Sequence, residues 1–368
     1  MSLMKFYPFF FSFLLAFVAS VQITAAPADD LQHIFASRPN GFLGADVATS
    51  IPHPSLKNTS FWLFGDTLIG TSTPTSRNIT GMPRNSIALL NHETLQPAFY
   101  HSNMGSSSFF NPPRFSTHSS PSSAWVWPIS AISYLNSIIV TSYHVVDDAE
   151  DPFGFAVDKN CFHFIQKPSI SPSTWSISTV FIPFSCPQLL LGPAVLTHGD
   201  VAYFVALEEK TIKRNVLIRS KASSLLQFNF YEILIAEQGG NKWVPLNFYL
   251  NNSNFEPFSF GTDTNECSLI FWNNKFIYFY GENFGSKIFA KISDSLIGPW
   301  SEPLFVYEVP SDFLGNNRFF YAVKAHPELS RDNFELILTY ATNSFDPKDL
   351  EKDPELYVPR FVRTRWNF

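Results

Sequence analysis

An apolar run typical of a β-strand recurs five times along this chain of 368 residues, each time in similar surroundings. A weaker strand and a turn precede each run, and a more exposed alternating strand follows it. The runs are Phe61–Gly65, Ile138–Tyr143, Val201–Leu207, Lys275–Tyr280 and Phe334–Tyr340. Radial repetition of small antiparallel sheets lets a β-propeller close without long exposed strand edges. The repeat therefore predicts an all-β chain that folds as one five-bladed β-propeller with little helix.

The N-terminal segment has the order of a secretory signal peptide. Lys5 precedes an apolar run, Phe6–Val18, and the small residues of Ile23–Ala26 follow. The apolar run is shorter than a membrane span requires, although a retained signal anchor is the alternative. We expect residues 1–26 to be removed, and residues 27–368 to form a single, monomeric, secreted domain that is extracellular and not membrane-bound.

Composition excludes several classes of function. The net charge is −6 and basic clusters are absent, which argues against nucleic acid as a partner. Aromatic residues make up 17% of the chain, which favours strands and aromatic-lined surfaces. Neither an Asp-rich loop for calcium nor cysteine spacing for zinc is present. We expect no metal and no cofactor, and a carbohydrate as the partner.

Two features fit an oxidising compartment. The three cysteines are an odd number, which predicts one disulfide and one buried thiol, with Cys161 and Cys186 closest in sequence. Three Asn-x-Ser/Thr triplets, at Asn58, Asn78 and Asn251, fall in turn-like segments. At least one of them is expected to be glycosylated.

The first repeat can be aligned in register. If the strand Ala45–Ile51 and the strand Phe61–Thr67 form an antiparallel hairpin, Asp46 lies opposite or diagonal to Asp66, with Cβ atoms about 5–8 Å apart. Two carboxyl groups this close repel, so one pKa rises and a neutral acid can coexist with an ionised base. Such a pair is typical of glycoside hydrolysis. The alternative is that Asp66 is only a turn residue.

The same alignment on the other repeats adds candidate residues around the same axis. Glu266 takes the place that Asp46 has in the first repeat. A sugar ring could be bound by acids, imidazoles and an ammonium group at its hydroxyls and by an aromatic ring at its C–H surface. Each of these residues can also have a purely structural role. These further candidates are Trp127, His144, Lys324 and His326.

Two arginines each precede an expected strand, one in the first repeat and one near the C-terminus. Arg84 and Asn85 precede the third strand of the first repeat, and both are candidate substrate-binding residues. Arg360 precedes the last strand. Arginine among acids commonly pairs bidentately with a carboxylate, so Arg360 either holds Asp46 or Asp66 or closes the fold by an ion pair. Phosphate-binding loops, Gly-x-Ser-x-Gly elbows and Cys/His dyads are absent.

Several short motifs together resemble the secreted proteins of domain-of-unknown-function family 4185, which are related to five-bladed glycoside hydrolases of the arabinanase and invertase type. The matching stretches are Gly44–Asp46, Trp62–Thr67, Arg84–Asn85, Trp127–Pro128, Ala325–Leu329, Leu338–Tyr340 with Asn343, and Tyr357–Phe361. The resemblance implies catalytic roles for Asp46 and Asp66, whereas the wider hydrolases imply Asp46 as base and Glu266 as acid. The second and third repeats lack the acids of the wider pattern.

Two functions follow from these observations. The first is a secreted glycoside hydrolase that acts on arabinan or another furanose-containing polysaccharide, with Asp46, Asp66 and Glu266 as catalytic residues. The alternative is a non-catalytic carbohydrate-binding propeller, since one fold hosts both classes.

Overall fold

The chain is built almost wholly from antiparallel β-sheets. The computed structural model describes residues 21–37, 41–102, 108–113, 124–150, 154–182, 189–209, 212–252, 254–315 and 317–368. Within these residues, strands form six sheets, five of which contain four or five strands. The predicted all-β class is confirmed.

The first large sheet and a small one share the N-terminal part of the chain. The large sheet consists of β3 (Thr49–Pro52), β4 (Thr59–Phe64), β7 (Ser86–Asn91) and β8 (Gln96–Tyr100), in that order. The small sheet has the order β2 (Phe42–Ala45), β5 (Thr67–Ser72) and β6 (Arg77–Gly81). β2 runs into β3, and β4 into β5, so the two sheets are successive parts of one hairpin.

The next three sheets follow one another along the chain. The second has the order β12–β11–β10–β9, the third β13–β14–β15–β16–β17, and the fourth β18–β19–β20–β21. Their strands are β9 (Ala124–Tyr134), β10 (Ser137–Asp147), β11 (Phe155–Gln166), β12 (Ile177–Phe181), β13 (Leu189–His198), β14 (Val201–Glu208), β15 (Arg214–Lys221), β16 (Glu232–Ile235), β17 (Lys242–Pro245), β18 (Ser268–Trp272), β19 (Lys275–Gly281), β20 (Lys287–Ser293) and β21 (Leu304–Glu308).

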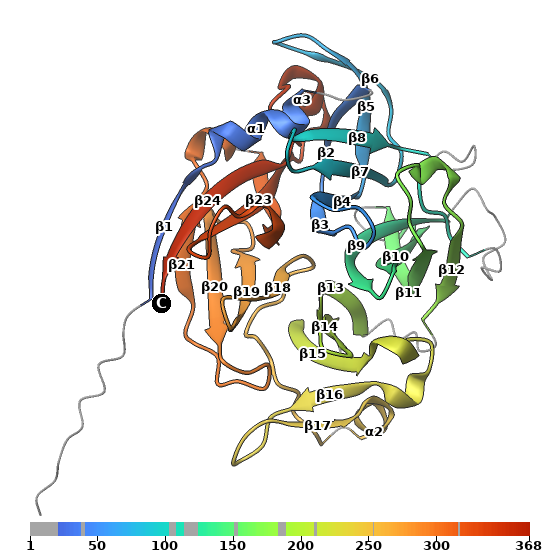
Figure 1. Ribbon diagram of the computed structural model, residues 1–368, viewed down its shortest axis with the longest axis vertical. Coiled ribbons are helices and arrows are strands. Elements are labelled where there is room, and N and C mark those ends of the chain that lie inside the picture. The colour runs from blue at the N-terminus through green and yellow to red at the C-terminus, as the bar shows by residue number, and fades with distance from the viewer. Residues whose placement is uncertain are drawn as a thin grey trace, which may run out of the picture.

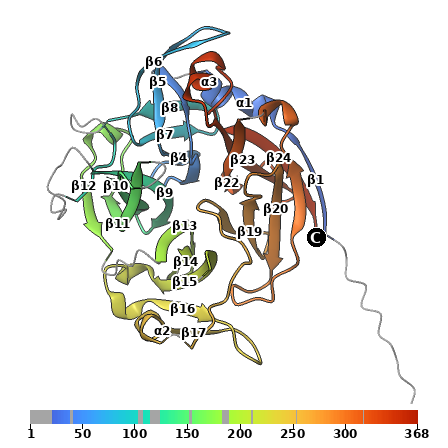
Figure 2. The same cartoon turned by 180° about the vertical axis from the view of Figure 1, so that it is seen from behind.

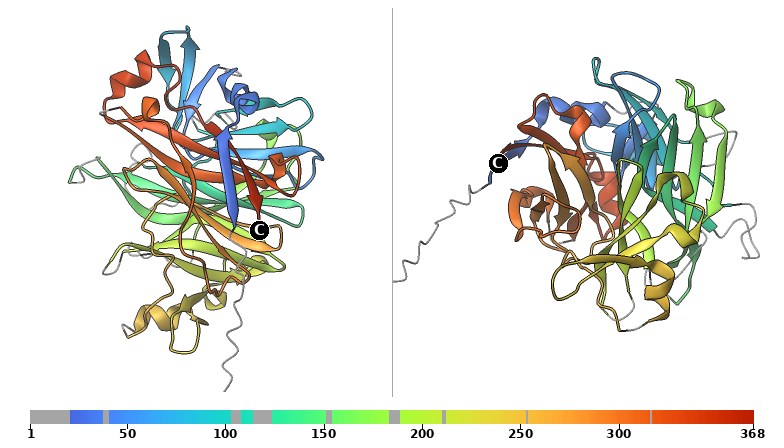
Figure 3. Two further views of the ribbon diagram at one scale, coloured as in Figure 1. Left: turned by 90° about the vertical axis from the view of Figure 1, so that its left-hand side faces the viewer. Right: turned by 60° about the horizontal axis from the view of Figure 1, so that its bottom comes forward.

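The last sheet joins both ends of the described chain. It has the order β1–β24–β23–β22, with β22 (Arg318–His326), β23 (Glu335–Ser344), β24 (Arg360–Asn367) and the N-terminal strand β1 (Gln22–Pro27). Figure 3 shows β1 lying along β24.

The strand β1 overlaps the end of the expected leader. Residues 22–26 pair with β24 from Gln22↔Asn367 to Ala26↔Arg363. The sequence Gln22–Pro27 alternates between more and less exposed side chains, as an edge strand does. Removal of residues 1–26 stays a prediction. The predicted apolar leader core lies in residues 1–20, outside the described residues.

The first strands of the five large sheets surround a common centre. β3 contacts β9, β9 contacts β13, β13 contacts β18, β18 contacts β22, and β22 contacts β3 again. Figures 1 and 2 show these strands innermost, with the later strands of each sheet farther out. Residues near the start of each first strand are thereby brought toward one another.

Apolar side chains fill the space between neighbouring sheets. Trp62 and Phe64 of β4 are fully buried against Phe361 of β24 and Phe35 of the helix α1 (Asp29–Ala36). Burying one large apolar side chain stabilises the fold by roughly 1.5–3 kcal/mol. The first and last sheets are therefore held together mainly by aromatic packing.

The α-helices are short and lie at the periphery. Besides α1, they are α2 (Leu246–Asn251) and α3 (Pro347–Lys352). α3 begins where its sequence predicts, because the Asp346 carboxylate accepts the Lys348 N–H at 3.0 Å and Pro347 stands at the first helical position. None of the helices in the described part of the chain is long and apolar enough to span a membrane.

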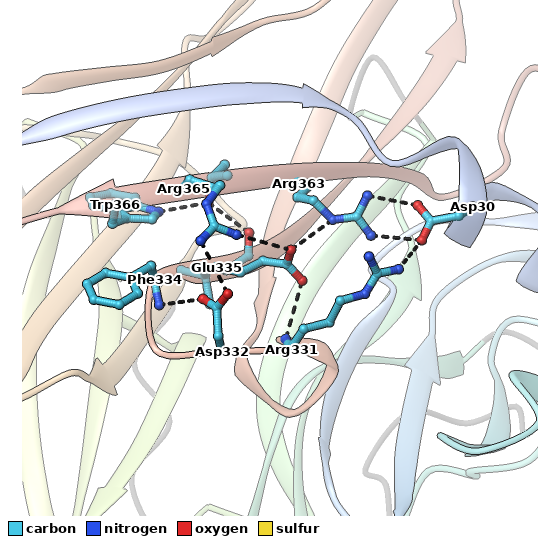
Figure 4. Close-up of polar contacts among 10 residues, drawn as sticks. Asp30, Arg331, Asp332, Phe334, Glu335, Arg363, Arg365 and Trp366 are labelled. Carbon is cyan, nitrogen blue, oxygen red and sulfur yellow. Dashed lines mark hydrogen bonds and ion pairs between the residues drawn. The ribbon is translucent and has the colours of Figure 1, made fainter.

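An ion-pair network ties α1 to the last sheet (Figure 4). Both terminal nitrogens of Arg363 donate to Asp30, at 2.8 and 2.9 Å, and its Nε lies 3.0 Å from Glu335. The hydrogen bonds from Arg363 lower the pKa of Asp30. Arg365 pairs with Asp332 at 3.2 Å. Single exposed pairs contribute little, but a bidentate pair inside a network fixes geometry. The network holds the segment after β1 against β23 and β24.

Candidate active site

Asp46 and Asp66 lie opposite each other at the join between the two N-terminal sheets. On one side of them Thr49 pairs with Leu63, and on the other side Ala45 pairs with Thr67. The two ladders share one register, and continuing it places Asp46 across from Asp66. The Gly65 N–H also donates to the Asp46 carbonyl at 3.3 Å. The hairpin register expected from the sequence is therefore the observed one.

The backbone is strained where β2 passes into β3. Val47 and Ala48 have φ angles of 65° and 48°, in the left-handed region that a β-branched residue rarely adopts. Gly65 is required opposite them, because a Cβ there would lie 2.3 Å from Asp46 Oδ1. Strain of this kind costs roughly 1–3 kcal/mol per residue and is concentrated at functional sites. Here it turns the Asp46 side chain out of the ladder.

Two tyrosines surround Asp46. The Tyr321 hydroxyl donates to Asp46 Oδ2 at 2.9 Å, and the Tyr357 hydroxyl donates to the Asp66 carbonyl at 3.1 Å. Burial raises the pKa of Asp46 well above its ordinary value, and the charges of Glu266 and Asp66 raise it further. The hydroxyl groups of Tyr321 and Tyr357 act in the opposite direction. Asp46 thus belongs to a coupled group of three carboxyls.

Asp66 has partners that favour its ionised form. Trp127 Nε1–H donates to Asp66 Oδ1 at 2.9 Å, and Arg84 Nη1 donates to Asp66 Oδ2 at 3.2 Å. Burial raises the pKa of Asp66, while the Arg84 charge and the two hydrogen bonds oppose that rise. The Asp66 side chain remains 18% exposed, so solvent reaches it.

Glu266 is paired with a buried lysine from the last sheet. Lys324 Nζ lies 3.5 Å from Glu266 Oε2 and donates to the carbonyls of Cys267 and Pro193 at 3.3 and 3.4 Å. The Lys324 side chain is 2% exposed and that of Glu266 is 14% exposed. Burial raises the pKa of Glu266, and the Lys324 charge opposes this.

A β-bulge directs Tyr321 and Lys324 toward the acids. The register of β22 against β23 shifts between these two residues, and Ala322 between them has a φ of 55°. A bulge re-aims the side chains on either side of it and is common beside active sites. As a result, one strand supplies both the hydroxyl at Asp46 and the ammonium at Glu266.

Three aromatic side chains of the second sheet adjoin Asp66, and we name them the Trp127 cluster: Trp125, Trp127 and Phe155. The ring centroids of Trp127 and Phe155 are 4.8 Å apart, and those of Trp125 and Trp127 are 5.8 Å apart. The Arg84 guanidinium lies over the Trp125 ring at 4.4 Å. The site therefore combines carboxyl groups with aromatic surface, which is typical of sites that bind an amphipathic ligand.

Asn85 and His144, expected as substrate-binding residues, are fully buried elsewhere. Asn85 Nδ2 donates to the carbonyls of Phe110 and Val126, at 3.0 and 2.9 Å, and so fixes the chain next to Arg84. His144 Nδ1 lies 3.3 Å from Asp158 Oδ2, inside the second sheet. Both side chains contribute to packing rather than to the surface beside the carboxyl groups.

His326 is likewise fully buried, at the seam between the first and last sheets. It stacks on Trp62 with ring centroids 4.5 Å apart, and its two nitrogens contact the hydroxyls of Ser50 and Thr339 at 2.6 and 2.7 Å. Burial lowers its pKa to about 3. The ring is thus neutral and held on both sides, so His326 supports the seam.

The carboxylate partner of Arg360 is Glu355, not Asp46 or Asp66. Arg360 Nη1 lies 3.1 Å from Glu355 Oε2, and its guanidinium stacks on Phe313 at 4.4 Å. The expectation that Arg360 holds an aspartate is wrong, because that task falls to Arg84. Arg360 makes the structural ion pair that was the alternative.

The residues missed from the sequence are Tyr321, Tyr357, Trp125 and Phe155. Tyr357 opens the Tyr-Val-Pro-Arg-Phe motif, whose arginine, Arg360, is the more obvious candidate for a site beside carboxylates. Tyr357 has a φ of 63°, which a bulky residue adopts only under constraint. Tyr321 stands three residues before Lys324 in Tyr-Ala-Val-Lys, and this proximity to a candidate residue is the available signal for it.

Two further expectations concern metal and cysteine. Among the described residues, no three His, Cys, Asp or Glu side chains are arranged to hold a metal ion. Cys161 and Cys267 are free and buried. Cys186 itself lies outside the described residues.

The fold and site define an all-β protein with a coupled carboxyl cluster at the centre of its sheets. A family model described as "Domain of unknown function (DUF5005)" matches residues 29–366. The chain belongs to this family. The finer expectation, family 4185, is not tested by this match. None of the curated proteins matches the chain.

One solved structure shares the fold at low sequence identity, and two others match with lower scores. A protein from Bacteroides ovatus ATCC 8483, provisionally named a hydrolase, matches with a TM-score of 0.73 and 16% identity over 93% of this chain and 90% of that one. A thermostable family-43 glycoside hydrolase gives 0.44, with 12% identity and 89% and 90% of the two chains covered. An α-L-arabinofuranosidase from Podospora anserina gives 0.46, with 10% identity and 89% and 92% covered. Only the first score is high enough to show a shared fold.

Proposed function

We propose that this chain is a glycoside hydrolase that cleaves a furanose-containing polysaccharide such as arabinan, with its five large sheets as the blades of a five-bladed β-propeller. The observation that carries the proposal is the position of Asp46 across the hairpin from Asp66, with Tyr321 and Lys324 of one strand placed at Asp46 and Glu266. Residues directly opposite in an antiparallel ladder have Cβ atoms about 5 Å apart, and catalytic carboxyl pairs are roughly 5–9.5 Å apart.

The environments of the three acids support different roles. Arg84 and the Trp127 N–H each donate to one oxygen of Asp66 and so fix the orientation of its carboxyl group. Asp46 accepts a hydroxyl hydrogen bond, and Glu266 is held by Lys324. We therefore assign Asp46 as the base or nucleophile and Glu266 as the acid that protonates the leaving oxygen. Asp66 is assigned to position substrate and to keep the pKa of Asp46 raised.

The surrounding side chains support a sugar as the ligand. The Trp127 cluster offers ring faces to the C–H surfaces of a sugar, and Arg84 is placed to reach a hydroxyl. The alternative, a non-catalytic carbohydrate-binding protein, would use the same aromatic surface. Coupled acids with raised pKa values favour the enzyme, because simple binding does not require them.

We also propose that the chain is a secreted, monomeric glycoprotein, and the exposure of its sequons supports glycosylation. Asn58, Asn78 and Asn251, the three sequon asparagines, all have exposed side chains. Expression in a secreting eukaryotic host followed by treatment with a peptide N-glycosidase tests this, and an unchanged mass would contradict glycosylation.

The proposed activity is tested with a panel of soluble glycans. Arabinan, fructan and plant cell-wall polysaccharides are incubated with the protein between about pH 4 and 8, a range that spans the ionisation of a perturbed carboxyl pair. New reducing ends from at least one glycan, absent with Asp46→Asn, are expected. No release from any member would contradict the enzyme and favour the binding protein.

A further inference from the structure

Three phenylalanines form an exposed aromatic surface at the seam between the fourth and last sheets, and we name them the Phe284 platform: Phe284, Phe319 and Phe345. Phe284 is 81% exposed and Phe345 is 57% exposed. The ring centroids of Phe319 and Phe345 are 4.6 Å apart, and Phe284 lies 6.4 and 6.3 Å from them. Each ring thus touches the other two while leaving a face to solvent.

The Phe284 platform includes a residue whose backbone conformation is unfavourable. Phe284 occupies the turn between β19 and β20 with a φ of 54°, a conformation that glycine or asparagine adopts more easily. Scattered exposed phenylalanines are ordinary, but three in mutual contact form a patch of the kind that marks a binding surface. Neither packing nor turn geometry explains an aromatic residue at this position.

The platform is continuous with the carboxyl cluster. Phe319 lies 5.5 Å from Tyr321, measured between ring centroids, and Tyr321 donates to Asp46. Beyond Asp46 lies Asp66, which accepts the Trp127 N–H. The path of contacts therefore runs from the Phe284 platform, over the two aspartates, to the Trp127 cluster.

We propose that the Phe284 platform binds sugar residues of the polysaccharide on one side of the cleaved bond, while the Trp127 cluster binds those on the other side. The protein then holds sugar residues of the polymer on both sides of the cleaved bond. This inference rests on the proposed function for the cleavage, but the binding is independent of catalysis.

The polar groups beside the platform favour a glycan over a protein partner. Asn343 Nδ2 donates to the Tyr321 hydroxyl at 3.4 Å, and Asn283 next to Phe284 donates to Asp263 at 2.6 Å. Aromatic faces with amide and hydroxyl groups at their edges match a ligand that has C–H faces and hydroxyl rims.

The test compares binding and cleavage in matched variants. Phe284 and Phe345 are changed together to alanine, in the otherwise unaltered protein and in the Asp46→Asn background. Phe305→Ala is the control, because Phe305 is 53% exposed but lies on β21, the strand of its sheet farthest from β18. Binding is measured by the retardation of each Asp46→Asn protein in gels containing arabinan, fructan or arabinoxylan. Cleavage is measured as kcat/KM on the polymer and on a trisaccharide of the same linkage.

The proposal expects at least a tenfold loss of polymer affinity in the double variant and none in the control. It also expects kcat/KM to fall on the polymer but not on the trisaccharide. Binding without cleavage by the unaltered protein would sink the proposed activity while leaving the platform in place. Equal polymer affinity of the double variant and its parent, no retardation of the parent by any glycan, or a parent dimer that becomes monomeric in the double variant would each overturn the platform.

Discussion

Asp46 and Asp66 face each other because two separate ladders of one hairpin share a single register. The ladder from Thr49↔Leu63 and the ladder from Ala45↔Thr67 meet at this pair, and the strained Val47 and Ala48 separate them. The acids therefore stand where regular pairing is interrupted, so their side chains are free to face the centre of the molecule instead of a neighbouring sheet.

Asp46→Asn should remove activity and leave the fold intact. Asparagine keeps the shape and still accepts the Tyr321 hydroxyl, but it cannot act as a base, so we expect a loss of about 10²–10⁴-fold. The melting temperature should stay equal or rise, because burial and like charges disfavour the Asp46 carboxylate. Initial rates of reducing-end release and thermal melts check this. Asp294→Asn, an acid that is 81% exposed, is the control. Full activity in Asp46→Asn would remove Asp46 from catalysis.

Tyr321→Phe should move the acidic limb of the pH–activity profile to higher pH. The Tyr321 hydrogen bond lowers the pKa of Asp46, so its loss lets that pKa rise further. A base must be ionised, and a larger fraction of Asp46 would then be protonated on the acid side. The profile of kcat/KM against pH measures the effect, with Tyr203→Phe on β14 as control. An unmoved limb with a uniformly lower rate would mean that Tyr321 only packs.

Lys324→Met should move the basic limb of the same profile to higher pH. The Lys324 charge lowers the pKa of Glu266, so an apolar replacement raises it. An acid must be protonated, and Glu266 would keep its proton to a higher pH. Lys324→Arg, which keeps the charge, should leave the limb near its original place if the variant folds. A basic limb unchanged in the methionine variant would exclude Glu266 as the acid.

Glu328→Gln should weaken the fall in the free energy of unfolding that the unaltered protein shows as pH rises toward neutral and alkaline values. Burial raises the pKa of Glu328 to about 7 from its ordinary value of 4.5. Between these two values the folded chain binds more protons than the unfolded chain, so the free energy of unfolding falls as pH rises, by about 3 kcal/mol in all.

Glutamine at position 328 cannot ionise, so its unfolding free energy should lack this fall. Denaturant unfolding at about pH 4.5 and about pH 8 measures the difference, two conditions that bracket the titration. Glu351→Gln, an exposed acid on α3, serves as the control. Identical pH dependence in Glu328→Gln and the unaltered protein would contradict the prediction.

The sequence was sufficient for the features that depend on local pattern. The alternation around Gly65 and Asp66 predicts a hairpin, and a hairpin register follows once both strands are bounded by turns. The carboxyl pair and the contribution of Trp127 could therefore be predicted from the sequence. Glu266 was found because its place in the fourth repeat corresponds to that of Asp46.

The contacts between segments that are distant in sequence could not be predicted. Tyr321 reaches Asp46 only through a bulge in β22, and nothing in the local sequence announces a bulge. His326 and Arg360 were read as site residues because a polar side chain in a motif suggests function. Burial beside Trp62 and pairing with Glu355 are tertiary facts that a single sequence does not carry.

The N-terminal strand could not be predicted for a different reason. Small and apolar residues before a proline are typical both of a leader's end and of a short edge strand, so Ile23–Ala26 fits either. Only a partner strand distinguishes the two, and that partner, β24, is the last strand of the chain.

This pairing also sets an order of events in assembly. Because Gln22 is matched with Asn367, the strand that emerges first from the ribosome must wait for the strand that emerges last. Contacts between such distant residues form slowly, since a long loop must close before they are gained. Until then β24 has an open edge, which is a template for pairing with other chains. Pairing of β1 with β24 should therefore be a late, aggregation-sensitive step of folding.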